Sequence, residues 1–171
     1  MRRTMNAQRR SCASFLLVAM FAVAADAATD LALWKELDIV PMPREVRLTG
    51  RELALDGALI VLGGSPSPQD EIGAEWINKR VARLGGAPLK IVKDGEARLR
   101  LIVGTRQSHP LIAAAGLKVG PDQPGERGYL IVPRRAGEST DVFLAGADPL
   151  GALYACVTLA ELLAQRPAGI V

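Results

Sequence analysis

The chain has 171 residues, of which 49% are hydrophobic, so it is long enough to bury the core of one compact domain. One histidine and two cysteines are too few for a zinc-type cluster of His and Cys ligands. The formal net charge of +3 lies in the first 27 residues, and the remaining 144 carry 17 basic and 17 acidic side chains, so charge gives no reason to expect a nucleic-acid partner.

Residues 1–27 have the pattern of a secretory signal peptide. Four arginines precede an apolar run from Ala13 to Ala25, and Ala25-Asp26-Ala27 has the small-x-small form of a cleavage site. The run is shorter than the 20 or so apolar residues that a membrane-spanning helix needs, so we expect no stable membrane insertion. The sequence therefore predicts a secreted or periplasmic protein, with an N-terminal linker over 28–36.

The first predicted strands follow a segment with two prolines. Residues 38–43 are typical of rigid, extended backbone, because proline restricts the residue before it. Residues 45–48 and 52–55 alternate polar and apolar side chains around Thr49-Gly50, which predicts a hairpin with one solvent-facing side. Residues 58–62 form an apolar run that predicts a more buried strand.

A long helix is predicted to begin after this strand. Ser67 suits the N-cap, Pro68 suits the first helical position, and Asp70-Glu71 suits the positive end of the helix dipole. Gly85-Gly86 predicts the end of the helix. We expect one apolar stripe to face the core, made of Ile72, Trp76, Ile77 and Leu84, with Val81 beside it.

The middle of the chain predicts further strands and a short helix. The short helix is expected over 111–115, and a surface loop with two prolines and two glycines follows it over 117–127. The last two strands of this region are expected to form a hairpin across 134–140. The predicted strands are 89–92, 99–103, 129–132 and 142–145.

A final helix is predicted to begin after Asp148, which suits the N-cap, with Pro149 at the first helical position. Its apolar residues extend so far around the helix that little of it is expected to face water. Either the helix is buried in its own domain, or its second side packs against another domain. The expected inward face consists of Leu150, Leu153, Tyr154, Val157 and Ala160.

Together these elements predict an α/β (α+β) sandwich. We expect one mixed β-sheet of about six or seven strands, with two main helices on one face of it. Only some neighbouring strands are joined by tight turns, and the long helix after residue 62 separates strands that can pair in parallel.

No constellation of residues predicts an active site. His109 is the one possible base of a Ser-His-Asp triad, and without a Gly-x-Ser-x-Gly motif we expect a surface or helix-capping role for it. The glycine-rich loop 63–67 lacks the spacing of a nucleotide-binding motif, and Pro68 removes a backbone donor. The dipole explains Asp70-Glu71 without any catalytic role. We therefore predict no catalytic, cofactor-binding or metal-binding residue, and no cofactor.

The sequence also predicts which aromatic rings and which thiol are exposed or buried. Sugar-binding platforms use exposed aromatic rings, and Trp34 is the one ring that we expect to be free. Cys156 lies in an apolar helical pattern, which predicts a buried and inert thiol. The rings expected to be buried are Trp76, Tyr129, Phe143 and Tyr154.

Four segments within residues 37–165 carry a resemblance to a known domain. Residues 38–50 match a P-x-P-x-x-V opening, residues 58–62 match its next strand, and Leu101-Ile-Val-Gly-Thr105 matches a central strand. The most specific match is the C-terminal part of the domain. It consists of Gly128-Tyr-Leu-Ile-Val132, Ala145-Gly-Ala-Asp-Pro-Leu-Gly-Ala-Leu-Tyr154 and Thr158-Leu159. These segments resemble the N-terminal, non-catalytic domain that precedes the barrel in β-N-acetylhexosaminidases, O-GlcNAcase-like enzymes and α-glucuronidases.

The resemblance implies a zincin-like α/β fold without the zincin metal motif. It also implies that the catalytic acids lie in a (β/α)₈ barrel, which needs about 250 residues, so no catalytic residue is carried over to this chain. The implied partner is that barrel, in cis or as a split product, with the helix-covered face or sheet edge as the contact. Residues 37–165 would be the hexosaminidase-like domain, and 166–171 a truncated C-terminal tail.

Three functions follow from these observations. The first is a non-catalytic accessory domain of a secreted, β-N-acetylhexosaminidase-like glycoside hydrolase whose barrel is missing from this chain, so that the chain itself is not expected to be an enzyme. The alternative is a free-standing secreted carbohydrate-binding or protein-interaction domain, with glycans as possible ligands. The sequence disfavours the third, an autonomous hydrolase, because it offers neither a placed pair of catalytic acids nor a metal cluster.

Overall fold

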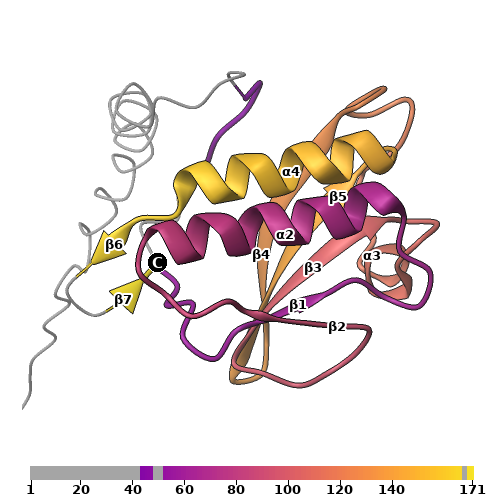
Figure 1. Ribbon diagram of the computed structural model, residues 1–171. Helices are drawn as coiled ribbons and strands as arrows, with labels where there is room; N and C mark the ends of the chain where they lie inside the picture. The colour runs from indigo at the N-terminus through magenta and orange to yellow at the C-terminus, as the bar shows by residue number, and fades with distance from the viewer. Residues whose placement is uncertain (1–42, 48–51, 167–168) are drawn as a thin grey trace, which may run out of the picture.

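The computed structural model describes residues 43–47, 52–166 and 169–171 (Figure 1). Several predictions of the preceding section fall outside these residues. They are the signal peptide at 1–27, the linker at 28–36, Trp34, most of the proline segment and the tip of the predicted hairpin.

A five-stranded mixed sheet forms the centre of the fold. Its strand order is β2-β1-β3-β5-β4, with β1, β2, β3 and β5 parallel and β4 antiparallel to β5. β1 lies between β2 and β3, although β2 and β3 are consecutive along the chain. The strands are β1 Leu59–Val61, β2 Lys90–Val92, β3 Leu99–Thr105, β4 Tyr129–Ala136 and β5 Ser139–Gly146.

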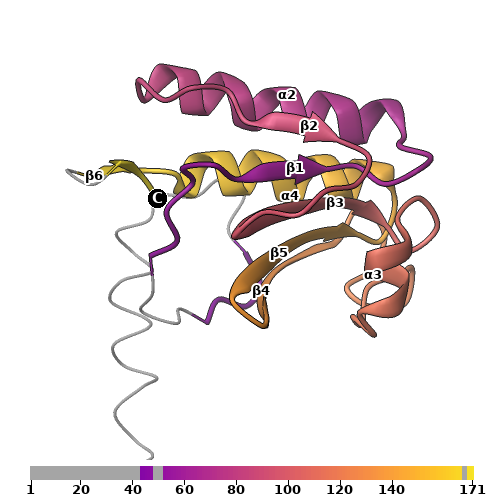
Figure 2. The same ribbon diagram turned by 90° about the horizontal axis from the view of Figure 1, so that it is seen from below.

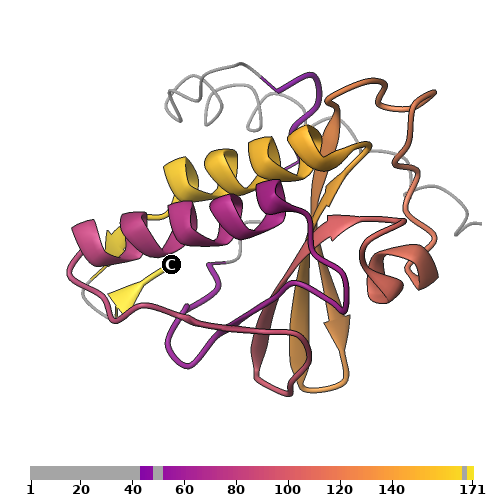
Figure 3. The same cartoon turned by 45° about the vertical axis from the view of Figure 1, so that its right-hand side comes forward.

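Two long helices lie side by side on one face of this sheet, as Figures 1 and 3 show. They are α2, Pro68–Arg83, and α4, Pro149–Leu162. The short helix α3, Pro110–Ala114, lies on the opposite face (Figure 2). The predicted sandwich with two main helices on one face is therefore confirmed, and the short helix adds cover to the other side.

The helix caps are those that the sequence predicts. Ser67 and Asp70 form a reciprocal capping box, in which the Asp70 amide donates to Ser67 Oγ and the Ser67 amide donates to Asp70 Oδ2. Asp148 caps α4 by accepting a hydrogen bond from the Gly151 amide at 2.8 Å. At the end of α2, Gly85 adopts a positive φ of 81°, which glycine tolerates without strain.

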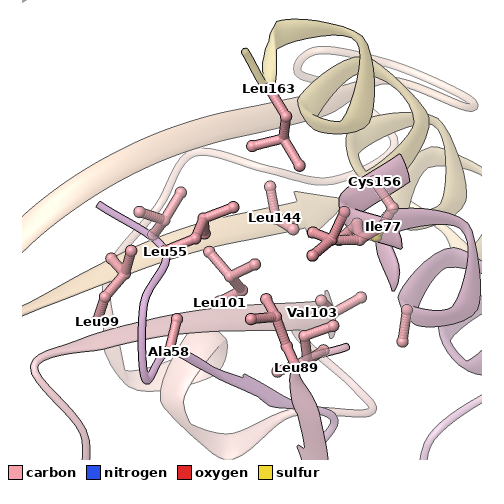
Figure 4. Close-up of a cluster of buried hydrophobic side chains, with 14 of the residues drawn as sticks. Leu55, Ala58, Ile77, Leu89, Leu99, Leu101, Val103, Leu144, Cys156 and Leu163 are labelled. Atoms are coloured by element: carbon pink, nitrogen blue, oxygen red, sulfur yellow. The ribbon is translucent and has the colours of Figure 1, made fainter. Parts of the chain in front are cut away.

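The strand register creates a core on each face of the sheet. Leu101 lies beside Ile60 of β1 and Val142 of β5 on the face toward the long helices. This larger core includes Leu144, Ile77 and Cys156 (Figure 4). Ile102 and Phe143 point to the other face, where they pack with Ile112 of α3, Leu117 and Val119.

The number and place of the strands differ from the prediction. The main sheet has five strands, and two short strands pair separately as an antiparallel ribbon, β6 Gln165–Arg166 and β7 Gly169–Ile170. The hairpin predicted at 45–48 and 52–55 is wrong in its described residues, since neither 45–47 nor 52–55 is a strand. Instead, the Leu55 amide donates to the Ile170 carbonyl at 2.9 Å, so the C-terminal ribbon supplies its partner. The zincin-like character of the fold stays a prediction.

Candidate functional site

Large apolar side chains are exposed on the outer side of the two long helices. Ile72 and Trp76 of α2 are 50% and 47% exposed, and Leu150 and Tyr154 of α4 are each 38% exposed. Helical periodicity places all four opposite the buried sides of their helices. We call these four residues the outer helix face. Because the two helices lie side by side (Figure 3), the four side chains belong to one layer of the molecule.

Small residues on the inner sides of the helices explain this arrangement. A Cβ atom added to Gly73 would lie 2.8 Å from Cys156 Sγ and 3.7 Å from Leu153 Cα, so the helices cross very closely there. Close approach needs small side chains at the contact, and the bulky apolar residues are left outside. The buried residues are Gly73, Ala74, Ile77 and Val81 with Asp70 on α2, and Gly151, Ala152, Ala155, Cys156, Thr158 and Ala160 on α4.

The predicted helix faces are therefore partly wrong. Ile72, Trp76, Leu150 and Tyr154 were expected to face the core, and they face outward. Of the rings expected to be buried, Phe143 is buried and Tyr129 is half-buried, with its hydroxyl 2.8 Å from Thr158 Oγ1. The helical spacing of the small residues on α2 and α4 is the signal that identifies the true inner faces.

Hydrogen bonds hold the outer helix face in one arrangement. The Arg80 guanidinium of α2 donates to the carbonyls of Ala160 and Leu163, at 3.1 Å each, and so ties α2 to the end of α4. Asn78 makes two reciprocal bonds with the backbone of Leu89, which fixes α2 to the chain before β2. Charged residues of the same two helices, among them Glu75 and Glu161, are exposed as well.

A second candidate site is an open crevice of about 430 Å³ at the carboxyl ends of the parallel strands. Open α/β sheets bind ligands at this edge, where neighbouring connections leave to opposite faces. Here β1 leads to α2 on one face and β3 leads to α3 on the other. The polar residues that line the crevice are Ser65, Thr105, Gln107, Ser108 and Asp148.

Three of the polar side chains of this crevice, those of Thr105, Ser108 and Asp148, are hydrogen-bonded within the chain itself. Ser108 Oγ accepts from the Thr105 amide at 2.9 Å, and Asp148 accepts from the amides of Gly151 and Arg127 at 2.8 and 2.7 Å. Burial alone would raise the pKa of Asp148, but these backbone hydrogen bonds outweigh it and lower the pKa overall. A phosphate at this helix end would have to displace a carboxylate, so the geometry disfavours an anion site.

A buried polar pair lies behind the crevice. Asp70 is fully buried and His109 is 2% exposed. His109 caps α3, with its Nδ1 accepting a hydrogen bond from the Leu111 amide at 3.2 Å. Burial lowers the pKa of His109, although the Val61 carbonyl and the Asp70 charge act in the opposite direction. The helix-capping role predicted for His109 is confirmed; its imidazole is buried and out of reach of a substrate in the crevice.

The thiol predicted to be inert is buried in the core. Cys156 is buried, as predicted, and burial raises the pKa of its thiol well above the ordinary value, so the thiol is unreactive. In the described ranges, no three His, Cys, Asp or Glu side chains gather as a possible metal site. Among the helices in those ranges, none has the length and apolar character required to cross a membrane.

Comparison with known families places the chain. The sequence model of the family described as glycosyl hydrolase family 20, domain 2, matches residues 36–171. The chain belongs to this family. Domain 2 of family 20 accompanies a catalytic domain, so the domain described here is an accessory domain of the glycoside hydrolase type.

The other comparisons add little to this assignment. No curated protein matches this chain in sequence. Among solved structures it is similar to a family GH115 4-O-methyl-α-glucuronidase with specificity for decorated arabinogalactans, at 21% identity and a TM-score of 0.49. That alignment covers 62% of this chain and 13% of the glucuronidase chain.

Proposed function

We propose that this chain is the non-catalytic domain that supports the catalytic barrel of a secreted, β-N-acetylhexosaminidase-like glycoside hydrolase. The observation that carries the proposal is the outer helix face, on which Ile72, Trp76, Leu150 and Tyr154 are exposed together. The chain belongs to a family defined as the second domain of a glycosyl hydrolase, which makes the catalytic domain the natural partner. The exposed apolar residues offer a surface on which that partner can pack.

The physics of the outer helix face supports a permanent contact rather than a transient one. Full burial of an exposed large apolar side chain is worth about 1.5–3 kcal/mol, and side chains that are 38–50% exposed gain roughly half of that when a partner covers them. Tryptophan and tyrosine dominate the energetics of interfaces, because they bring large area with little loss of conformational entropy. The Arg80 hydrogen bonds hold the two helices together beforehand, which lowers the entropy cost of docking.

Association can be tested with tryptophan fluorescence. The chain has two tryptophans, so a Trp34→Phe variant leaves Trp76 as the one tryptophan of this chain, and the emission of the barrel alone is subtracted. The variant is mixed with a family 20 catalytic barrel from the same genome, or linked to it. We expect a blue shift of the Trp76 emission and protection from acrylamide quenching. Unchanged emission with no complex in size-exclusion chromatography would contradict the proposal.

A matched pair of variants locates the contact. Ile72→Glu places a charge in the outer helix face, and we expect it to weaken association at least tenfold. Ile91→Glu is the control, because Ile91 is 43% exposed but lies on the edge strand β2, away from α4. Equal weakening by both variants would show that the outer helix face is not the contact.

One observation favours a second function. Trp76 and Tyr154 are exposed aromatic rings on the same helix layer, and such rings can stack on sugars, as a carbohydrate-binding domain requires. Isothermal titration with chitin oligosaccharides tests this directly. Under this alternative Trp76→Ala abolishes glycan binding by the isolated chain, whereas under the main proposal the isolated chain binds no glycan.

Export is part of the main proposal and rests on residues 1–27. The arginine-rich start, the apolar run and the Ala25-Asp26-Ala27 site support cleavage after Ala27. Expression of the complete chain in a bacterial host followed by N-terminal sequencing should give a mature protein that begins at Ala28. Retention of the full-length chain in the cytoplasm would contradict this part.

A further inference from the structure

The single histidine of the chain has a definite tautomer in this fold. Its Nδ1 accepts a hydrogen bond from the Leu111 amide, which is one of the free donors at the start of α3. A neutral imidazole carries a proton on one nitrogen and accepts at the other. The proton of His109 is therefore on Nε2. Any further proton must bind to Nδ1, the atom that now caps the helix.

The imidazole of His109 is closely packed. A Cβ atom at Gly63 would lie 3.1 Å from two ring carbons, and one at Gly104 would lie 3.3 Å from His109 Cβ. The ends of β1 and β3 thus hold the residue on two sides. The charged groups that act on the ring are Asp70 of α2, Arg100 of β3 and Asp94 of the turn before β3.

We propose that His109 is an acid-sensitive latch: neutral, it caps α3 and holds it on the sheet, and protonated, it releases the Leu111 amide so that α3 opens. Protonation turns Nδ1 from an acceptor into a donor, so the cap and the charged ring cannot coexist. A charge on a side chain that is 2% exposed also loses its hydration, which favours an open state with the ring in water.

The opening is expected to be local. Helix α3 covers the smaller core, in which Ile112, Leu117 and Val119 pack on Ile102 and Phe143. The larger core lies on the other face of the sheet, between the strands and the two long helices (Figure 4). Release of α3 therefore exposes one face of the sheet and leaves the helix layer in place.

The direction of the pH dependence follows from the burial of the ring. Burial lowers the pKa of His109 below its usual 6.5 in the closed state, and the open state restores the usual value. Above about pH 6.5 both states are neutral and α3 stays closed. As the pH falls below 6.5, the open fraction rises by up to about tenfold for each pH unit until the open state predominates.

Two measurements on the purified chain test the latch. Because there is one histidine, its ring signals in a ¹⁵N–¹H NMR spectrum need no assignment. At pH 7.5 we expect Nε2 to be protonated and Nδ1 to be a bare acceptor. Between pH 7 and 5, hydrogen exchange at the Leu111 to Ala115 amides, corrected for its intrinsic pH dependence, should accelerate tenfold or more relative to β5 amides.

A variant separates the latch from general acid sensitivity. Asparagine caps helices well and does not titrate, so His109→Asn should keep α3 closed and lose the accelerated exchange at pH 5. The same acceleration in the variant would overturn the proposal. A proton on Nδ1 of the wild-type ring at pH 7.5, or ring titration without opening of α3, would also overturn it, and both readouts stand if the variant does not fold.

Discussion

The crossing of the two long helices gives the sharpest test of the structure. Gly73 lies in the middle of α2, where alanine is intrinsically favoured over glycine by about 1 kcal/mol. In this fold, however, the alanine Cβ would lie 2.8 Å from Cys156 Sγ and 3.0 Å from Cys156 Cβ. Atoms do not approach so closely, so the helices or the Cys156 side chain must shift.

The two effects oppose each other and their magnitudes decide the sign. Overpacking of a closely packed core costs about 1–3 kcal/mol, and the helix-propensity gain offsets about 1 kcal/mol of it. We expect Gly73→Ala to lower the free energy of unfolding by about 1 kcal/mol, which lowers the Tm by about 2–4 °C for a domain of this size. Urea unfolding followed by far-UV circular dichroism measures the change.

A double-mutant cycle identifies the cause. Cys156→Ala removes the sulfur that meets the new methyl group but retains the Cβ, so it should relieve part of the clash. In that background Gly73→Ala should be neutral or stabilising, with a coupling energy of about 1 kcal/mol between the two sites. A stabilising effect of Gly73→Ala in the wild-type background, with no coupling to Cys156, would refute the close crossing and the reasoning built on it.

Other predictions concern the caps, the buried ion pair and acid. Asp148→Ala removes the α4 cap and the bond from the Arg127 amide, so it should cost about 1–2 kcal/mol in urea unfolding, with Asp148→Asn closer to wild type. Because the pKa of Asp148 is lowered in the fold, its stabilising contribution is present above the unfolded value of 3.8 and should be lost in acid titrations below it. Arg100 Nε and Nη2 donate to the two carboxylate oxygens of Asp141 at 2.7 and 2.8 Å, so Asp141→Asn should cost about 1–3 kcal/mol, and replacement of both residues by apolar ones should cost less. Overall stability should fall by at most about 1.4 kcal/mol per pH unit below pH 6.5, and a flat profile in wild type from pH 7 to 5 would contradict the burial of His109.

Local signals in the sequence predicted the helices and the central strands of the described residues. Ser67, Asp148 and Gly85 begin or end helices through bonds to residues within a few positions of themselves, so their roles can be read without a tertiary structure. The buried strands β1 and β3 likewise follow from short apolar runs. The strand predicted at 52–55 failed because the Leu55 amide pairs with Ile170, more than a hundred residues away.

The candidate interface was not predictable in the same way. Helix α4 is apolar on almost every side, so its large apolar residues do not indicate which side is inward, and only the spacing of its small residues does. Trp76 shows the same problem on α2, where the size of the side chain favoured burial and the structure exposes it. The His109 cap was expected, but its burial beside Asp70 depends on the meeting of three elements at one edge of the sheet.

By itself the sequence determined the family, the order of the helices and central strands, and the residues that cap them. Only the tertiary structure decided that β1 lies between β2 and β3, and that Ile72, Trp76, Leu150 and Tyr154 face outward. The physical reason is the range of the interactions. Caps and turns depend on neighbouring residues, whereas the inward side of a helix is set by how closely small residues such as Gly73 and Ala155 let it approach another element.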